Sequence, residues 1–167
     1  KGIDLSSVMV DECIKKGLDA ECVDISKVDG KYDAIVSIFD VLNFLDAQML
    51  EKFLDSVAAK LNDDGIFIAD INTLYGFSEV AEGTMSKDTE DEFLCVEAEF
   101  LNDELHTFFT LFVKEDDRKF TKYHDKIVQY FHKIKTFQKH KALKLVDKQT
   151  FSLYDTEDKT LLIFVKR

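Results

Sequence analysis

The first half of the chain alternates between short apolar runs and segments whose apolar residues recur at helical spacing. Apolar runs over residues 20–23, 32–39 and 66–71 are typical of strands, and the second is continuous enough to predict a strand buried on both faces. Residues 50–61 carry apolar side chains at i, i+3, i+4, i+7 and i+11, which predicts an amphipathic helix. Ser6 is a good N-cap for an earlier helix. Strands that alternate with helices predict a doubly wound, mostly parallel α/β sheet.

The second half of the chain differs, because alternation with a period of two largely replaces the helical spacing. Five strands are expected there, over residues 94–100, 105–113, 120–128, 143–153 and 160–166. A short polar connection at 102–104 predicts that the first two form a β-hairpin. Residues 74–90 are polar, contain two glycines and are expected to form a loop, and a helix is expected within 127–141.

Length and composition narrow the class of protein. The 167 residues suffice for one domain with a sizeable core, and a hydrophobic fraction of 46% excludes a mainly disordered chain. The longest apolar runs are five residues, whereas a membrane span needs roughly 20. Three cysteines without CxxC spacing argue against a disulfide framework or a zinc site. Because nothing resembles a secretory signal, we expect a cytoplasmic protein.

The charge of the chain is acidic overall but unevenly placed. A net charge of −11 argues against general nucleic-acid binding, which depends on neutralising phosphates. Residues 118–148 nevertheless hold ten Lys or Arg, and residues 79–104 hold ten Asp or Glu. We interpret the two segments as solvated surfaces that attract each other. The alternative is that the basic segment docks an anionic partner.

Polar side chains collect where the predicted strands of the first half finish. These residues are Asp4, Asp24, Asp40, Asn43, Asp70 and Asn72. In an open parallel sheet, ligands bind outside the carboxyl ends of the strands. The sequence therefore places the candidate binding site at this edge before any motif is considered.

Four segments of the chain are informative in their order and spacing: GIDLSSVMV at 2–10, YDAIVSIFDVLNFL at 32–45, LEKFLDSVAAKLNDDGIFIADINT at 50–73, and the closing pair KLVDKQTF and TLLIFVKR. Together they resemble the class I S-adenosylmethionine-dependent methyltransferases that act on small molecules. The resemblance covers nearly the whole chain. It implies a Rossmann-like sheet with an antiparallel C-terminal strand pair, and an inserted antiparallel β lid over the substrate pocket at 90–128.

One part of the family pattern has no counterpart in this sequence. The family's first strand ends in an acidic residue and a Gly-x-Gly loop, but no two of the six glycines here are two or three positions apart. Lys1 corresponds to the start of the family's second strand. We therefore infer that residues 1–167 are a single methyltransferase-like domain that is incomplete at its N-terminus.

The resemblance also assigns roles to residues at the strand ends. Asp4 would accept hydrogen bonds from the ribose hydroxyls of S-adenosylmethionine, and Asp24, with the amide of Ile25, would bind the adenine. Leu5 and Met9 would line the adenine, and Phe39 would contact the methionine part. The alternative for Asp4 is a solvated acid near a helix N-terminus, for Asp24 a turn residue that caps Ser26, and for Leu5 and Met9 an ordinary core position.

The resemblance places the methyl acceptor beside the ends of the next two strands. Asp40, Asn43, Asn72 and Tyr75 are the candidates for substrate binding, and the alternative for them is a capping or buried structural role. The resemblance identifies no catalytic residue, because methyl transfer depends mainly on alignment of the reacting atoms. His124 is the candidate general base if the acceptor must lose a proton, although a structural histidine is the simpler interpretation. His132 and His140 are eight residues apart and do not form a ready metal pair, so no metal site is expected.

Two rival functions remain open at this stage. The first is a non-catalytic Rossmann-like fragment or partner-binding module that uses the basic segment. The second is a nicotinamide-dependent oxidoreductase, since an acid at a strand end also suits a dinucleotide ribose. The preferred reading is a cytoplasmic methyltransferase with a small-molecule substrate and no nucleic-acid or membrane partner, and the oligomeric state stays open.

Overall fold

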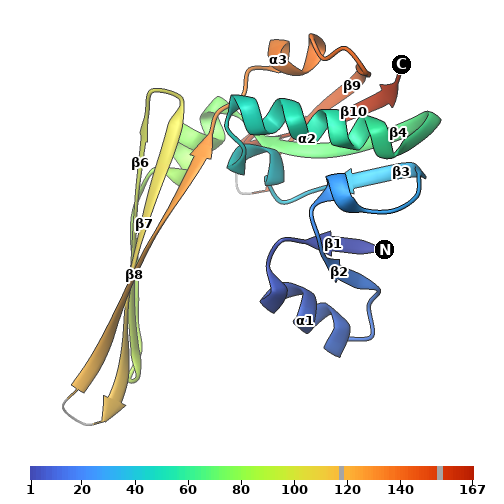
Figure 1. Ribbon diagram of the computed structural model, residues 1–167. Coiled ribbons are helices and arrows are strands. Elements are labelled where there is room, and N and C mark those ends of the chain that lie inside the picture. The colour runs from blue at the N-terminus through green and yellow to red at the C-terminus, as the bar shows by residue number, and fades with distance from the viewer. Residues whose placement is uncertain (117–118, 154–155) are drawn as a thin grey trace.

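The computed structural model describes residues 1–116, 119–153 and 156–167, so Arg118 of the basic segment lies outside the described residues. Figure 1 shows three parts: an N-terminal unit of two strands and a helix, a central sheet with its helices, and a long sheet that projects from one end of the central sheet. None of the described helices has the length and apolarity needed to cross a membrane.

The N-terminal unit (residues 2–27) is a strand–helix–strand arrangement. It consists of β1 (Gly2–Asp4), α1 (Ser7–Lys15), β2 (Ala20–Cys22) and the short 3-10 helix η1 (Ile25–Lys27). Strands β1 and β2 pair in parallel, with Asp4 opposite Cys22. The predicted N-cap of α1 is confirmed, since the Ser6 hydroxyl accepts the Met9 N–H at 3.3 Å.

The central sheet has four strands in the order β3-β4-β10-β9. They are β3 (Tyr32–Ser37), β4 (Leu61–Asn72), β9 (Leu143–Phe151) and β10 (Lys159–Lys166), and they are joined by η2 (Val41–Phe44), α2 (Ala47–Lys60) and α3 (Ile134–Gln138). Strand β3 runs parallel to β4, whereas β10 runs antiparallel to both of its neighbours. The expected antiparallel closing pair is therefore confirmed.

The hydrophobic core lies between the central sheet and helices α2 and α3. The ring of Phe67 on β4 stacks on Phe164 of β10 at 5.5 Å between centroids, and Phe137 of α3 reaches the Phe164 ring at 6.1 Å. Helix α2 buries Leu50, Leu54, Val57 and Ala58. Each large apolar side chain buried in this way contributes about 1.5–3 kcal/mol, so this layer holds α2 and β4 in place.

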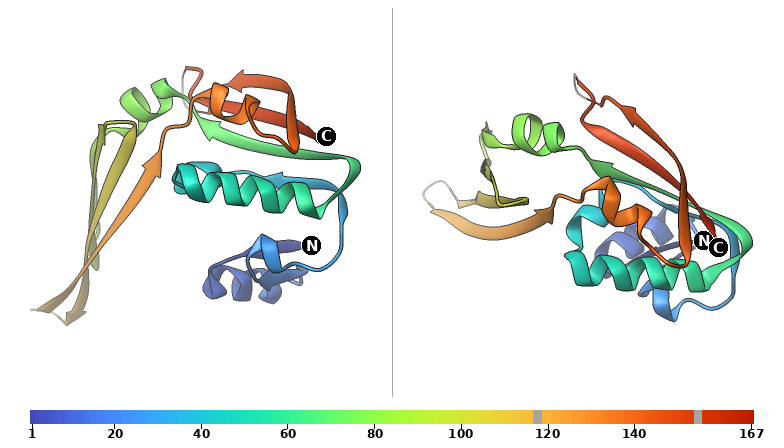
Figure 2. Two further views of the ribbon diagram at one scale, coloured as in Figure 1. Left: turned by 45° about the horizontal axis from the view of Figure 1, so that its top comes forward. Right: turned by 90° about the horizontal axis from the view of Figure 1, so that it is seen from above.

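The opposite face of the central sheet is apolar but uncovered. The strand register aligns Val36 with Ile68 and Ile68 with Ile163, and Ile66 lies on the same face. Val36 is 59% exposed and Ile66 is 37% exposed. Figure 2 shows α2 and α3 on one side of the sheet and no described helix on the other. We call this surface the bare face.

The bare face overturns one expectation and modifies another. Residues 32–39 were expected to be buried on both faces, and for the described residues this is wrong, because β3 has helices on one face only. The structure also contains two separate parallel pairs, β1-β2 and β3-β4, instead of one continuous parallel sheet. The described chain is thus an α/β fold with mixed sheets.

The projecting sheet is antiparallel, with strands in sequence order. It consists of β5 (Gly83–Asp88), β6 (Glu92–Leu101), β7 (Glu104–Asp116) and β8 (Lys119–Tyr130). Asn102 and Asp103 have φ of 56° and 65°, the backbone of a two-residue hairpin turn, so the predicted hairpin is confirmed. At the base of the sheet, the Phe77 ring stacks on Phe100 with 5.3 Å between centroids.

Two expectations for the second half are wrong in detail. Residues 74–90 were expected to form a loop, but they contain the π-helical turn η3 (Gly76–Ala81) and strand β5. The helix expected within 127–141 covers only Ile134–Gln138, because β8 continues to Tyr130 and takes up the first part of that segment. The apolar residues in 127–141 thus belong first to strand β8 and then to helix α3.

Candidate functional site

The carboxyl ends of β1 and β2 bring together the first two predicted site residues. Asp4 ends β1, Asp24 follows β2, and the Val23 N–H donates to the Asp4 carbonyl oxygen at 3.1 Å. One oxygen of Asp4 accepts the Ser6 N–H at 2.8 Å, and one oxygen of Asp24 accepts the Ser26 N–H at 2.8 Å. Both side chains are exposed, so each carboxylate presents its second oxygen to solvent.

The Asp24 carboxylate is held in its charged form. The hydroxyl of Ser26 and then its backbone N–H lower the pKa of Asp24 below the usual value, because both donate to the ionised carboxylate. Asp24 is therefore a stable acceptor at neutral pH. Such an acceptor suits a ligand that presents N–H or O–H donors.

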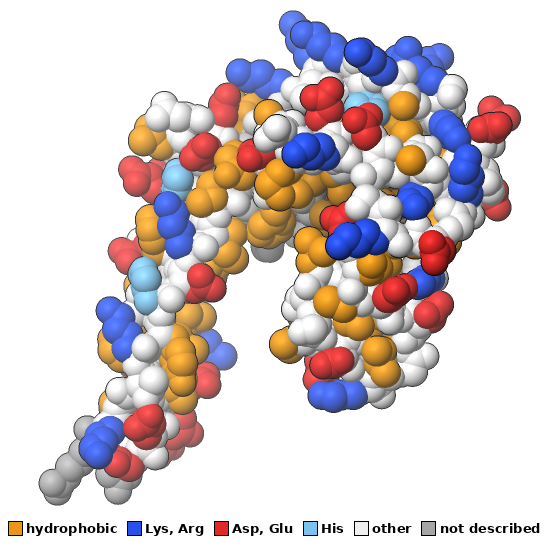
Figure 3. All heavy atoms as spheres, in the orientation of Figure 1, with side chains coloured by type: hydrophobic (Ala, Val, Ile, Leu, Met, Phe, Trp, Pro, Cys, Tyr) orange, Lys and Arg blue, Asp and Glu red, His pale blue; other side chains and the backbone are white. Residues whose placement is uncertain are grey.

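Large apolar side chains near the ends of β1 and β3 are uncovered. Leu5 is 74% exposed, Met9 is 57% exposed and Phe39, beyond the end of β3, is 77% exposed. Ile25, the first residue of η1, is instead buried. Figure 3 shows a hollow between the projecting sheet and the N-terminal unit, with hydrophobic side chains along its upper part. The strand ends open toward this hollow (Figure 1).

The loop after β3 has an unusual backbone. Phe39 and Asp40 have φ of 64° and 63°, in the left-handed region that residues other than glycine rarely adopt. Such a conformation costs about 1–3 kcal/mol for each residue and persists only where the surroundings enforce it. The left-handed backbone at Phe39 and Asp40 follows a strand that ends at Ser37, two residues earlier than expected. The Phe39 ring lies outward, exposed to solvent.

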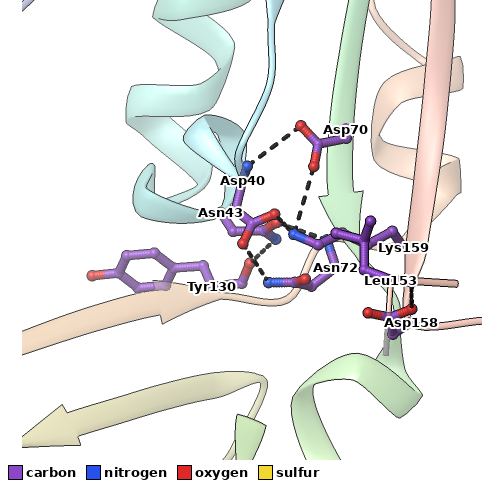
Figure 4. A network of polar contacts seen from close by, with 8 residues as sticks. All are labelled: Asp40, Asn43, Asp70, Asn72, Tyr130, Leu153, Asp158 and Lys159. Atoms are coloured by element: carbon purple, nitrogen blue, oxygen red, sulfur yellow. Dashed lines mark hydrogen bonds and ion pairs between the residues drawn. The ribbon is translucent and has the colours of Figure 1, made fainter. Parts of the chain in front are cut away.

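A polar network holds this loop, as Figure 4 shows. The Lys159 ammonium, at the start of β10, forms an ion pair with Asp40 and lies 3.6 Å from Asp70 on β4. The Asp40 N–H donates to Asp70 at 3.4 Å. The Asn72 side-chain amide donates to the other Asp40 oxygen at 3.2 Å. Both oxygens of the Asp40 carboxylate are therefore engaged in contacts within the protein. These contacts offset the backbone strain at Phe39 and Asp40.

Burial shifts the pKa of two members of this network. Lys159 and Asp70 lie almost completely out of solvent, at 6% and 5% exposure. Burial lowers the pKa of Lys159 to about 8 and raises the pKa of Asp70. With Asp40, the network holds two carboxyl groups against one amine, so its charge at neutral pH is negative or zero.

Asn43 connects the central sheet with the projecting sheet. Its side chain is fully buried; the oxygen accepts the Asn72 N–H at 2.9 Å and the nitrogen donates to the Tyr130 carbonyl at 2.8 Å. His132 makes a similar connection, since its Nε2–H donates to the carbonyls of Leu42 and Leu45 at 3.1 and 2.9 Å. Both side chains tie the end of β8 to the loop that carries Asp40.

The structure thus sorts the predicted site residues into two groups. Asp4, Leu5, Met9, Asp24 and Phe39 lie exposed near the strand ends, with the Ile25 backbone beside them. Asp40, Asn43 and Asn72 belong to the polar network, and Tyr75 lies exposed just before η3. Asn43 has no exposed surface that a ligand could contact. His124, the candidate base, faces Thr110 across the projecting sheet at 3.3 Å, in the middle of β8.

Sequence reasoning missed Lys159 and Tyr130 and gave Asp70 no binding role. Lys159 sits in a strand start that carries no motif, and only the register of β10, which sets Lys159 opposite Asn72, places it at the site. Among the described residues no group of three or more His, Cys, Asp or Glu is arranged to hold an ion.

The comparison with known proteins gives a clear result for the fold. No protein-family model matches the sequence, and no curated relative matches it either. Solved structures do match, each across nearly the whole of this chain. An S-adenosylmethionine-dependent methyltransferase from Clostridium acetobutylicum is 24% identical with a TM-score of 0.78, over 99% of this chain and 75% of that chain.

Two sugar-modifying enzymes match in the same way. The sugar N-methyltransferase KedS8 from Streptoalloteichus sp. is 12% identical, with a TM-score of 0.75, over 99% of this chain and 70% of that one. The amino pentose methyltransferase CalS10 from Micromonospora echinaspora is 13% identical, with a TM-score of 0.68, over 99% of this chain and 73% of that one. At these identities the likeness concerns architecture: residues 1–167 have the fold of S-adenosylmethionine-dependent methyltransferases.

Proposed function

We propose that this chain is a methyltransferase domain that uses S-adenosylmethionine to methylate a small-molecule acceptor. The observation that carries the proposal is the shared fold together with two open carboxylates, Asp4 and Asp24, at the ends of adjacent parallel strands. A nucleoside presents hydroxyl and amino donors, and acidic side chains at strand ends are suited to receive them.

The residues of the N-terminal unit fit such a cofactor. Asp4 accepts from the ribose hydroxyls, Asp24 accepts from the adenine amino group, and the Ile25 N–H donates to the base. Leu5, Met9 and Phe39 supply the apolar contacts, which accounts for their exposure in this structure. The bound cofactor supplies an activated methyl group, and the protein has mainly to align it with the acceptor.

The acceptor is proposed to enter from the hollow beneath the projecting sheet. Asn72 and Tyr75 lie at the end of β4 on this path, and Asp40 and Asn43 fix the loop beside it. KedS8 and CalS10 act on a sugar nitrogen and an amino pentose, as their names state. An amino group on the acceptor would suit this side of the site through longer-range attraction, because carboxyl groups outnumber amines in the buried Asp40–Asp70–Lys159 network.

The domain arrangement is part of the same proposal. Residues 1–167 form a single methyltransferase-like domain without the first strand and glycine-rich loop, and residues 90–128 form the lid. In the complete protein, β1-β2 and β3-β4 would belong to one doubly wound, mostly parallel sheet. We also propose that the protein is cytoplasmic.

Calorimetric titration of S-adenosylhomocysteine tests the proposal. The titration is run on residues 1–167 and on the same polypeptide extended upstream by roughly 40 residues, about one strand–helix unit. We expect the extended polypeptide to bind. Asp4→Asn should weaken its affinity by about 10-fold to 100-fold, because hydrogen bonds to a charged group contribute about 1.5–3 kcal/mol. Asp63→Asn, at a 96% exposed side chain on β4, is the matched control and should change it less than about twofold.

The outcomes separate the candidate functions. If residues 1–167 bind as tightly as the longer polypeptide, the cofactor site needs no upstream segment. If both polypeptides are folded and neither binds, the methyltransferase proposal fails, and the partner-binding module becomes the better interpretation.

A further inference from the structure

The loop that carries Phe39 has a backbone conformation that its own residues do not favour. Phe39 and Asp40 both have positive φ, and neither is a glycine. For an aromatic residue this conformation is rare. The Phe39 ring gains little packing in return, since it is 77% exposed. The contacts that enforce this backbone therefore come from the next residue, Asp40.

The contacts of Asp40 converge on one buried cation, the Lys159 ammonium. One Asp40 oxygen pairs with Lys159 Nζ, and the other accepts the Asn72 side-chain N–H at 3.2 Å. Lys159 Nζ also lies 3.6 Å from one oxygen of Asp70, and the other Asp70 oxygen accepts the Asp40 N–H at 3.4 Å. Lys159 therefore contacts the Asp40 carboxylate and also the acceptor of its backbone N–H (Figure 4).

We call Asp40, Asp70 and Lys159 the clamp. Its members come from the loop after β3, from β4 and from the start of β10, and Asp40 and Lys159 are 119 positions apart in the chain. Lys159 is the one cation of this group. Without the ammonium, two carboxyl groups would face each other with little solvent between them, which disfavours their charged forms. The charge of Lys159 therefore decides whether Asp40 stays at this place.

Stability alone is a poor explanation for the buried lysine. Replacing a buried ion pair with apolar side chains of similar size is often neutral or stabilising. An ion pair, unlike an apolar contact, fixes one arrangement of its partners, because its energy depends on where the charges lie. The arrangement fixed here is the left-handed backbone that exposes the Phe39 ring. Backbone strain of this kind gathers at functional sites.

We propose that Lys159 is a positioning residue for methyl transfer, which holds Asp40 so that the Phe39 ring faces the methionine part of S-adenosylmethionine. The inference rests on the proposed function, which assigns that contact to Phe39. Lys159 itself does not touch the cofactor, since its side chain is only 8% exposed. The adenosine part is assigned to Asp4 and Asp24, at the separate pair β1-β2. Lys159 therefore acts on one part of the cofactor only.

Calorimetric titration with two ligands tests this role, on the polypeptide extended upstream by roughly 40 residues. S-adenosylhomocysteine carries the amino-acid part that faces Phe39, whereas adenosine lacks it. Lys159→Met should weaken the affinity for S-adenosylhomocysteine about 10-fold at pH 7, because a minority of molecules then hold the loop in the binding conformation. The affinity for adenosine should change less than about twofold, since its proposed contacts lie elsewhere.

The pH dependence of binding makes the same perturbation without a substitution. Burial lowers the pKa of Lys159 to about 8, so the folded natural chain loses the ammonium above that pH. Among the described residues, the carboxyl groups that face Lys159 are Asp40 and Asp70, whereas the adjoining Asp158 accepts the Leu153 N–H at 2.8 Å. The affinity of the natural chain for S-adenosylhomocysteine, divided by that of Lys159→Met, should fall from about 10 at pH 7 to less than about 2 at pH 9.5. Titration of the ligand's own amino group cancels in this ratio.

Lys166→Met is the matched control, because Lys166 lies near the other end of the same strand. Its Nζ donates to the Leu61 carbonyl at 2.9 Å and to Asp63 at 3.2 Å, away from the clamp. This variant should bind S-adenosylhomocysteine within about twofold of the natural chain at each pH. Circular dichroism verifies that the variants fold. If Lys159→Met does not, Lys159→Gln replaces it, since glutamine keeps a donor for Asp40 but carries no charge, and its ratio should fall over the same pH range.

The outcomes separate this inference from the proposed function. Equal weakening of both ligands by Lys159→Met, or a ratio that stays constant from pH 7 to 9.5, would show a structural role only. Either result would overturn the inference while the methyltransferase proposal stands. If the natural polypeptide binds neither ligand, the proposed function fails, and the inference fails with it.

Discussion

Replacing Asn43 with leucine removes the side chain that connects the loop after β3, the end of β4 and the end of β8. Leucine has a similar size but neither accepts nor donates a hydrogen bond. The change therefore leaves the Asn72 N–H and the Tyr130 carbonyl without their partner, at sites that are partly buried. The position itself is fully buried, so water cannot replace the lost carboxamide directly.

The expected loss of stability follows from two opposing contributions. Each backbone group left unpaired costs about 1–3 kcal/mol, and burying leucine in place of asparagine returns about 2 kcal/mol. The net decrease in the free energy of unfolding should be about 2 kcal/mol. For a chain of this size, that lowers the melting temperature by about 4–8 °C.

Urea denaturation followed by circular dichroism measures this change, with Asn62→Leu as the matched control. Asn62 donates to Asp33 at 2.8 Å in an exposed position, so its replacement should cost less than about 0.5 kcal/mol. Asn43→Asp is a third variant. It keeps the acceptor for Asn72 but loses the donor to Tyr130 and buries a carboxylate, so it should be less stable than Asn43→Leu at pH 7. Equal stability of the Asn43→Leu and Asn62→Leu variants would refute the reasoning.

Three further predictions concern the same region. Burial lowers the pKa of His132 below 6.5, so below pH 6.5 the unfolded chain binds a proton that the folded chain does not. Stability should fall as pH drops from 6.5 to 5, and urea titrations of His132→Gln should show a flatter dependence. Burial lowers the pKa of Lys159 from 10.5 to about 8. Between pH 8 and pH 10.5, Lys159 is therefore protonated in the unfolded chain but neutral in the folded chain. As pH rises from 8 to 10.5, the free energy of unfolding of the natural chain should therefore increase relative to that of Lys159→Met, by up to about 1.4 kcal/mol per pH unit. Urea titrations that give the same difference at every pH would contradict the shift. A methyl group at Gly76 would overlap the Asp158 carbonyl oxygen, so Gly76→Ala should cost about 1–3 kcal/mol in thermal unfolding, whereas Gly2→Ala, with its nearest atom at 3.7 Å, should cost less.

The parts of the site that sequence could locate are those fixed by local structure. Asp4 and Asp24 each follow a short strand and precede a helical turn, and the cap that Asp24 makes with Ser26 lies within two residues. Hydrophobic periodicity was enough to find the long helix α2 and most of the strands, but it missed β5. The single doubly wound sheet that was expected does not appear among the described strands, which form two separate parallel pairs, β1-β2 and β3-β4.

The parts that sequence could not locate depend on distant register. Lys159 reaches Asp40 across 119 positions, and Asn43 reaches Tyr130 across 87. No periodicity encodes such distances. The left-handed backbone at Phe39 was also hidden, since no glycine marks it and the network that enforces it comes from β4 and β10. Gly76 was read as a loop residue, whereas it provides the space for the backbone of Asp158.

The projecting sheet begins and ends at neighbouring points of the fold. Phe77, in the helical turn that precedes β5, lies 6.1 Å from Phe131, the residue that follows β8. A segment whose two ends meet can be exchanged as a cassette, because its replacement leaves the path of the remaining chain unchanged. A single block between residues 82 and 131 can therefore be exchanged by recombination. The strand ends that carry Asp4 and Asp24 would be inherited without alteration.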